Sequence, residues 1–275
     1  MVEAIVRAAG PYSLRLTAGT TSWRARLPDG AWAAAGQLPD GAIAISASSE
    51  LAVEHARFML ALDDDTSEFH RRFANDPLIG PAVQRLRGMR PRRKATVTHA
   101  VVRAICGQLI QASRALSIER AILRAADADP PTQESVARLS PARITGCGLA
   151  ASRAATLTRL ARSLDLEGLK GRDDALERLE RERGIGPWTV GVVSLQGLGR
   201  YDAGLVDDLG LVKLLASLRR RWPEPGETAE LLAPYEEWQG LASSYLLQGF
   251  KRGLIRGASM DRARLVRASA GIAAA

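Results

Sequence analysis

Short runs in which apolar and polar residues alternate occupy about the first 48 positions and predict β-strands. A residue pattern of period two is typical of a strand that packs one face on a core and leaves the other in solvent. The tetrapeptide Leu-Pro-Asp-Gly occurs twice, at 27–30 and 38–41. Proline presets the φ of a turn and glycine accepts a positive one, so both copies predict tight reversals. We therefore expect a small antiparallel sheet, with strands at 13–17, 22–27 and 42–46.

Apolar spacings of three and four residues begin near Ser49 and predict helices for the rest of the chain. One helix is expected to begin there and a second near Thr66. The later helices are predicted at 97–112, 114–127, 132–138, 151–164, 173–182, 187–198, 208–221, 227–232 and 235–251. The fold class is therefore α+β: a small N-terminal antiparallel β-sheet domain with flanking helices, followed by a larger all-α domain.

A basic, proline-containing segment at 85–94 marks the expected domain boundary, which we place at or just before it. The predicted division is an N-terminal sheet-plus-helix domain at 1–80 and an all-α domain at 81–257. Residues 258–275 are rich in alanine and arginine and are expected to form a C-terminal tail.

The charge balance is strongly basic, with a net charge of +8 over 275 residues. Only four of the 38 basic residues are lysines, so arginine predominates. The rigid guanidinium fork suits phosphate oxygens, and this favours a polyanionic partner. A GC-rich coding bias that uses arginine in place of lysine would give the same excess, so charge alone does not decide.

Cysteine usage and the N-terminus bear on the compartment. Cys106 and Cys147 lie among apolar or small neighbours, which is typical of free thiols in a reducing environment. The chain opens without a basic-then-apolar signal pattern, and no apolar run approaches the ~18 residues of a membrane span. We expect a cytoplasmic protein that has no membrane partner.

The segment Arg-Gly-Ile-Gly-Pro-Trp-Thr at 183–189 predicts a site for a phosphate. Pro187 suits the first position of a helix, where its missing N–H is harmless. The turn formed by Gly184, Ile185 and Gly186 leaves backbone amides at a helix N-terminus, where the dipole favours an anion. Two helices joined in this way grip a DNA backbone without reading its sequence. The alternative is a plain helix–turn–helix corner that uses glycine only for tightness.

An aspartate pair follows the hairpin, in Val-Asp-Asp-Leu-Gly-Leu at 206–211. A carboxylate beside the C1′ atom of a nucleotide would stabilise the positive charge that develops when the base leaves. The alternative is that Asp207 or Asp208 only caps the helix that begins at Leu209.

The hairpin and the aspartate together resemble the signature of the helix-hairpin-helix DNA glycosylase superfamily. Segments at 66–80, 102–111 and 234–242 resemble further parts of that family in the same order, so the likeness covers roughly residues 66–250. The closest branch is the alkylation-repair type, 3-methyladenine DNA glycosylase II. The resemblance implies two helical subdomains with a cleft between them.

The resemblance also implies roles for particular residues. Asp208 matches the catalytic aspartate rather than Asp207. Val192, Leu209 and Ser244 stand where relatives often carry pocket aromatics, with Tyr245 next to the last of these. Base-pocket residues are then Trp188, Leu209, Val192 and Tyr245; DNA-binding residues are Gly184, Ile185, Gly186, Thr189, Gln108 and Leu109.

Leu109 matches the apolar wedge that fills the gap left by a flipped base. A core stripe is equally compatible with the sequence, because Val101, Ile105 and Leu109 repeat every four residues. The resemblance further implies a monovalent cation at the hairpin, held by the main-chain carbonyls of Glu180, Glu182 and Ile185, with no other cofactor required.

Lyase-type members of the superfamily carry a lysine where this chain has Trp188, and Lys213 is poorly placed to replace it. The resemblance therefore implies a monomeric, monofunctional enzyme that excises alkylated purines from duplex DNA containing damaged bases. Two alternatives stay open: a helix-hairpin-helix protein that binds damaged DNA without cleavage, and a glycosylase for an oxidised or deaminated base.

Overall fold

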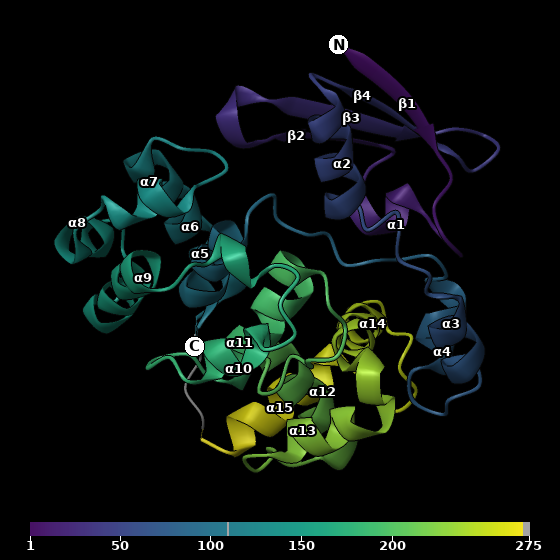
Figure 1. Ribbon diagram of the computed structural model, residues 1–275. Helices are drawn as coiled ribbons and strands as arrows, with labels where there is room; N and C mark the ends of the chain where they lie inside the picture. The colour runs from purple at the N-terminus through teal and green to yellow at the C-terminus, as the bar shows by residue number, and fades with distance from the viewer. Residues whose placement is uncertain (109, 272–275) are drawn as a thin grey trace.

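The computed structural model describes residues 1–108 and 110–271. Within them, four strands form one antiparallel sheet at the N-terminal end of the molecule (Figure 1). The strands are β1 (Val2–Val6), β2 (Ser22–Arg26), β3 (Trp32–Gln37) and β4 (Ile43–Ala47), in the spatial order β1-β4-β3-β2. Helix α2 (Glu50–Met59) covers one face and closes a small apolar core with it.

Both predicted reversals are confirmed. The first Leu-Pro-Asp-Gly joins β2 to β3, and the second joins β3 to β4. Gly30 and Gly41 have φ angles of 74° and 87°, which glycine adopts without strain.

The strand predicted at 13–17 is wrong, because this segment is helix α1 (Leu14–Ala18). Ser13 caps its N-terminus by accepting a hydrogen bond from the Leu16 amide, at 3.3 Å. Gly19 ends it in the left-handed conformation. Five residues are too few for apolar spacing to separate a strand from one helical turn, and the caps at each end decide the outcome.

The rest of the described chain is mainly helical, as predicted. The helices fall into two groups on either side of α5 and α11, one around α6 to α9 and the other around α12 to α15 (Figure 1). Their bounds are α3 Ser67–Phe73, α4 Gly80–Arg85, α5 Val97–Gly107, α6 Ala112–Ala126, α7 Gln133–Ala137, α8 Pro141–Gly146, α9 Ala151–Ser163, α10 Ala175–Glu180, α11 Pro187–Val193, α12 Leu209–Arg219, α13 Glu227–Leu232, α14 Gln239–Lys251 and α15 Met260–Ser269.

Two apolar clusters organise the packing. One lies under the sheet and comprises residues up to Leu62 together with Ala95, and the other fills the helical part. Phe69 and Phe73 of α3 and Val83 of α4 belong to the helical cluster. Packing therefore groups α3 and α4 with the helices, whereas the sequence prediction assigns residues up to 80 to the sheet domain. In the expected tail, α15 packs on α12.

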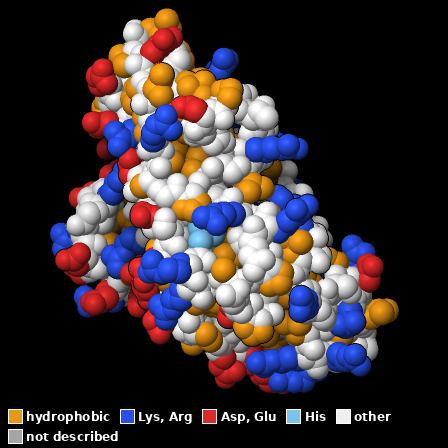
Figure 2. All heavy atoms as spheres, turned by 90° about the vertical axis from the view of Figure 1, so that its right-hand side faces the viewer, with side chains coloured by type: hydrophobic (Ala, Val, Ile, Leu, Met, Phe, Trp, Pro, Cys, Tyr) orange, Lys and Arg blue, Asp and Glu red, His pale blue; other side chains and the backbone are white. Residues whose placement is uncertain are grey.

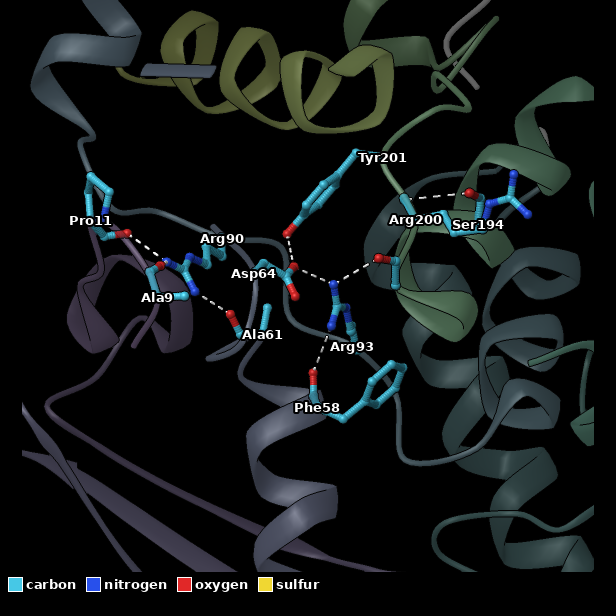
Figure 3. Close-up of polar contacts among 11 residues, drawn as sticks. Ala9, Pro11, Phe58, Ala61, Asp64, Arg90, Arg93, Ser194, Arg200 and Tyr201 are labelled. Atoms are coloured by element: carbon cyan, nitrogen blue, oxygen red, sulfur yellow. Dashed lines mark hydrogen bonds and ion pairs between the residues drawn. The ribbon is translucent and has the colours of Figure 1, made fainter. Parts of the chain in front are cut away.

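Arg93, in the linker between α4 and α5, joins the two parts of the molecule (Figure 3). Its guanidinium pairs with Asp64, which follows α2, and donates to the carbonyl oxygen of Gly199 at 2.9 Å. The hydroxyl of Tyr201 also donates to Asp64. A buried ion pair therefore connects the end of the sheet domain to the loop that leads toward Asp208.

Candidate active site at the glycine hairpin

The hairpin at 181–186 turns between α10 and α11 as a close-packed corner. Gly184 has a φ of 86°, and a Cβ atom there would lie 2.8 Å from the Oγ1 of Thr156. Glycine is therefore required at this position both for the backbone angle and for the close approach of α9. Pro187 occupies the first turn of α11, as expected.

The amides of the hairpin are not all free for a phosphate, which corrects part of the sequence prediction. The amide of Ile185 donates to the carbonyl oxygen of Glu182 at 3.0 Å and closes the turn. The amides of Gly184 and Gly186 have no hydrogen-bond acceptor among the residues that the structure describes. These two amides, which precede α11, can donate hydrogen bonds to an anion.

Asp208 is the N-cap of α12, and its two carboxylate oxygens have different partners. Oδ1 accepts from the Gly210 amide at 2.7 Å and Oδ2 accepts from the indole Nε1 of Trp188 at 2.9 Å. The two interpretations of this aspartate are therefore not exclusive. It caps the helix, and its other oxygen faces the hairpin tryptophan.

Asp207 faces away from this pair. Its φ is 62°, and its carboxylate accepts from the hydroxyl of Thr228 on α13 at 2.9 Å. Of the two carboxylates, that of Asp208 faces the hairpin tryptophan and that of Asp207 faces α13.

Glycines allow the segments around Trp188 to approach one another. A Cβ on Gly107 would lie 2.6 Å from the Cη2 atom of Trp188, so the end of α5 lies directly against the indole. Gly191 of α11 packs in the same way against the carbonyl of Gly204. This second contact holds α11 against the loop that leads to α12. Trp188 and Asp208, twenty residues apart in the sequence, are thereby brought together.

Gln108 ties the end of α5 to the hairpin. Its side-chain amide donates to the carbonyl oxygen of Gly184 at 3.1 Å and to the Oγ1 of Thr189 at 3.0 Å. Thr189 is only 2% exposed, so its side chain orients Gln108 and does not present a DNA-binding group to solvent. Leu109, the expected wedge, lies outside the described residues.

A cleft of about 1410 Å³ opens between the sheet domain and the helices. One end is lined by Leu195, Leu205 and, on α14, Ser244, Leu247 and Gln248. A Cβ on Gly210 would collide with Leu247, so this side of the cleft packs against the first turn of α12, although Asp208 and Trp188 do not themselves line the cleft. Leu209, half-buried, begins that helix.

Two of the expected pocket residues lie in the core instead. Tyr245 is fully buried, and its hydroxyl lies 3.0 Å from the carbonyl oxygen of Met89 and 3.3 Å from Nε2 of His70. Val192 is 4% exposed and packs among the core helices. Neither residue lines the cleft, and neither do the other two expected pocket residues, Trp188 and Leu209.

Sequence reasoning missed Leu247 and Gln248 as cleft residues. They follow Ser244 at spacings of three and four, which places all three on one face of α14. That spacing is the available signal, whereas the sequence prediction names the neighbouring Tyr245.

A charged cluster lines the cleft wall on α5 and α6. The carboxylate of Glu119 accepts from Lys94 at 2.8 Å and lies 3.0 Å from Nε2 of His99. Burial raises the pKa of Glu119, but the contacts with His99 and Lys94 outweigh it and lower that pKa to about 2. Over the described range, no three His, Cys, Asp or Glu side chains are grouped to hold a metal ion.

The relatives found by comparison with known proteins are described as a DNA glycosylase and as a DNA repair enzyme. No family model matches the chain. A DNA-3-methyladenine glycosylase of Bacillus subtilis is 28% identical over 217 residues, covering 72% of this chain and 71% of that protein. A probable bifunctional transcriptional activator/DNA repair enzyme AlkA of Mycobacterium tuberculosis is 27% identical over 213 residues. That match covers 71% of this chain and only 42% of the mycobacterial protein.

Solved structures share the fold at low sequence identity. The 3-methyladenine DNA-glycosylase from Archaeoglobus fulgidus superposes with a TM-score of 0.77 at 19% identity, covering 90% of this chain and 98% of that one. The 8-oxoguanine glycosylase/lyase of Clostridium acetobutylicum gives a TM-score of 0.68 at 18% identity, with 90% and 95% covered.

The glycine hairpin and the aspartate bonded to its tryptophan therefore lie in a fold that is shared with solved DNA glycosylases. The sequence is similar to a DNA-3-methyladenine glycosylase.

Proposed function

We propose that this protein is a monofunctional DNA N-glycosylase that flips alkylated purines of the 3-methyladenine type out of duplex DNA and excises them. The observation that carries the proposal is the hydrogen bond between Asp208 and Trp188 at the hairpin. The Bacillus subtilis and Archaeoglobus fulgidus relatives named above support the same substrate class.

The chemistry follows from a carboxylate held beside a tryptophan. A purine alkylated on a ring nitrogen is cationic and leaves with the electrons of its bond to C1′. Positive charge then develops on the sugar, and the carboxylate of Asp208 stabilises it. The same carboxylate orients water and takes its proton as the water oxygen bonds to C1′. The products are the free base and an abasic site.

A base must leave the helix stack before this reaction, at a cost of a few kcal/mol. The indole of Trp188 offers an electron-rich surface for a cationic base. Its Nε1 is held by Asp208, so the ring and the carboxylate are oriented together. Leu205 and Leu247 supply apolar walls to the adjoining cleft. We propose that Leu109 is the apolar wedge that fills the gap left by the flipped base.

We also propose that the enzyme does not cleave the DNA strand. Trp188 occupies the position where lyase-type members carry a lysine, and an indole forms no Schiff base with C1′. Lys213 lies more than one helical turn beyond Asp208 on α12. The expected product is an intact strand with one base missing.

The hairpin suits a monovalent cation as well as a phosphate. The carbonyl oxygens of Glu180, Glu182 and Ile185 are hard ligands on residues that are at least partly exposed. The carbonyl of Glu182 already accepts the Ile185 amide and keeps one lone pair for a cation. A bound Na⁺ or K⁺ would add positive charge where the DNA phosphate approaches.

We propose that the protein acts as a monomer, in the cytoplasm. The two cysteines, Cys106 and Cys147, are free thiols, as expected in a reducing compartment that contains DNA. No helix in the described part of the chain has the length and apolar character needed to cross a bilayer.

The test is base release by the wild-type protein from a panel of duplexes. The panel contains DNA methylated with dimethyl sulfate, an 8-oxoguanine duplex and a hypoxanthine duplex. We expect release of 3-methyladenine without strand cleavage. Release only from the 8-oxoguanine or the hypoxanthine duplex would show that the substrate is an oxidised or deaminated base and not an alkylated purine. Salt-sensitive binding with no release from any duplex would leave a DNA-binding protein and overturn the enzymatic proposal.

A further inference from the structure

We propose that the sheet domain contributes a phosphate-binding wall to the cleft, formed by Arg24 and Arg26 on β2 and Arg92 in the linker. This basic wall would hold the backbone of the DNA strand that flanks the lesion. The inference rests on the proposed function, since it names a second DNA contact for the same substrate.

The charge of the cleft supports a polyanionic occupant. Its lining carries seven Lys or Arg side chains and only two carboxylates, those of Glu119 and Asp129. The whole chain has a net charge of +8, so this one lining accounts for a large part of it. On the face drawn in Figure 2, Lys and Arg side chains border a hollow below the sheet-bearing upper end.

Four of the seven basic side chains have structural partners. Arg93 pairs with Asp64, while Lys94 and Arg103 pair with Glu119. Arg90 is 1% exposed and donates to main-chain carbonyls, including that of Pro11 at 2.9 Å. Arg24, Arg26 and Arg92 are exposed and have no ion pair with any residue that the structure describes. Only these three remain available to a ligand.

The geometry of β2 presents its two arginines on one face. β2 is an edge strand, and residues two apart on a strand point to the same side. Arg24 lies opposite Ala34 on β3, a small neighbour that leaves its guanidinium uncovered. Arg26 lies opposite Trp32, which is 37% exposed and lines the same cleft.

This combination matches a nucleic-acid strand better than other anions. Guanidinium groups bind phosphate oxygens in bidentate fashion, and an exposed indole stacks on a base. The cleft lining extends from the basic wall to Ser244 and Leu247, and Leu247 lies against Gly210, two residues after Asp208. A strand with its damaged nucleotide at that end would therefore bring flanking phosphates toward the sheet.

The test compares Arg24→Ala/Arg26→Ala with a control of equal charge change, Arg252→Ala/Arg256→Ala. The control arginines are exposed, lie at and beyond the C-terminal end of α14, and do not line the cleft. The probe is a 25-base-pair duplex that contains a tetrahydrofuran abasic-site analogue, with Kd measured over a series of KCl concentrations. A cooperative thermal transition near that of wild type verifies that both variants fold.

The logarithm of the association constant falls linearly with the logarithm of the KCl concentration. We expect this slope to become shallower by about 2 for the β2 variant, since each phosphate contact contributes about 0.9 to its magnitude. Its affinity should fall about tenfold at moderate salt, while the control matches wild type. Base release at saturating methylated DNA should be unchanged in the control variant.

Equal slopes for the two double variants would overturn the inference. So would slower base release at saturation with an unchanged slope, because it would place these arginines at the chemistry. A wild-type protein that binds the abasic-analogue duplex but releases no base from methylated DNA would defeat the proposed enzymatic function, while the comparison of slopes would still decide the inference.

Discussion

The carboxylate of Asp208 connects two structural tasks at the scale of one residue. One oxygen caps α12 through the Gly210 amide, and the other holds the indole of Trp188. Because both oxygens are engaged, the side chain is fixed before DNA binds. A fixed charge costs no reorganisation when the sugar cation develops.

Gly107 provides a test of this arrangement without touching the carboxylate. In Gly107→Ala the new methyl group would meet Trp188 Cη2 at 2.6 Å, so the indole must shift and its bond to Asp208 must weaken. We expect base release to slow about 10- to 100-fold, as a misplacement of about 1 Å does. Single-turnover release from methylated DNA measures it.

Gly146→Ala is the matched control, because a Cβ there meets no atom within 4 Å. It should release base at the wild-type rate. Equal rates for the two variants would show that the indole position does not matter.

At this scale the sequence predicted the pairing of hairpin and aspartate, because local motifs encode both. It could not predict the direction of Tyr245. Ser244 and Tyr245 are adjacent on α14 and point about 100° apart, and only tertiary packing decides which of them faces the cleft. The arginines of β2 were missed because their alternation is also typical of an ordinary solvated strand face.

At the scale of elements, α3 and α14 meet around His70. Its Nε2 lies 3.3 Å from the hydroxyl of Tyr245 and 3.4 Å from the Gly88 amide, which donates to it. Burial lowers the pKa of His70 to about 4, and the charges of Arg87 and Arg90 act in the same direction. The folded protein therefore keeps this imidazole neutral.

This lowered pKa makes stability depend on pH with a definite sign. The unfolded chain binds a proton near pH 6.5 and the folded protein only near pH 4, so acid favours unfolding between those values. The free energy of unfolding should fall by up to about 1.4 kcal/mol per pH unit from this residue. Urea unfolding of wild type and His70→Gln at pH 7 and pH 5 measures the difference.

Burial also lowers the pKa values of His55 and His99, so wild type and variant share some acid sensitivity. We therefore expect the free energy of unfolding to fall more between pH 7 and pH 5 in the wild type than in His70→Gln. An identical loss in both proteins would contradict it.

Element boundaries show what sequence patterns resolve. The helix predicted at 97–112 ends at Gly107, where the chain turns to bring Gln108 to the hairpin. The helix predicted at 187–198 is α11 followed by a π-helical turn from 194 to 198. Apolar periodicity continues through both irregularities, so periodicity alone cannot locate them.

At the scale of the whole molecule, the Arg93–Asp64 pair links the sheet domain to the helices (Figure 3). The basic wall on β2 can act with Asp208 only if these parts keep their relative positions. The side chain of Arg93 is 6% exposed, so its charge depends on Asp64 for compensation.

Asp64→Asn should therefore lower the free energy of unfolding by about 3 kcal/mol, because it leaves a buried guanidinium without its anion. The control is Asp63→Asn, whose exposed pair with Arg57 should contribute less than about 1 kcal/mol. Chemical denaturation of both variants measures the two values. Equal losses would show that Arg93 does not join the domains.

Asp208→Asn tests the central claim most directly. Asparagine is as good an N-cap as aspartate, so the variant should fold and bind DNA as wild type does. We predict that single-turnover release of 3-methyladenine falls about 10²- to 10⁴-fold, while Asp207→Asn, whose side chain faces Thr228, stays near the wild-type rate. Release by Asp208→Asn at the wild-type rate would contradict the account.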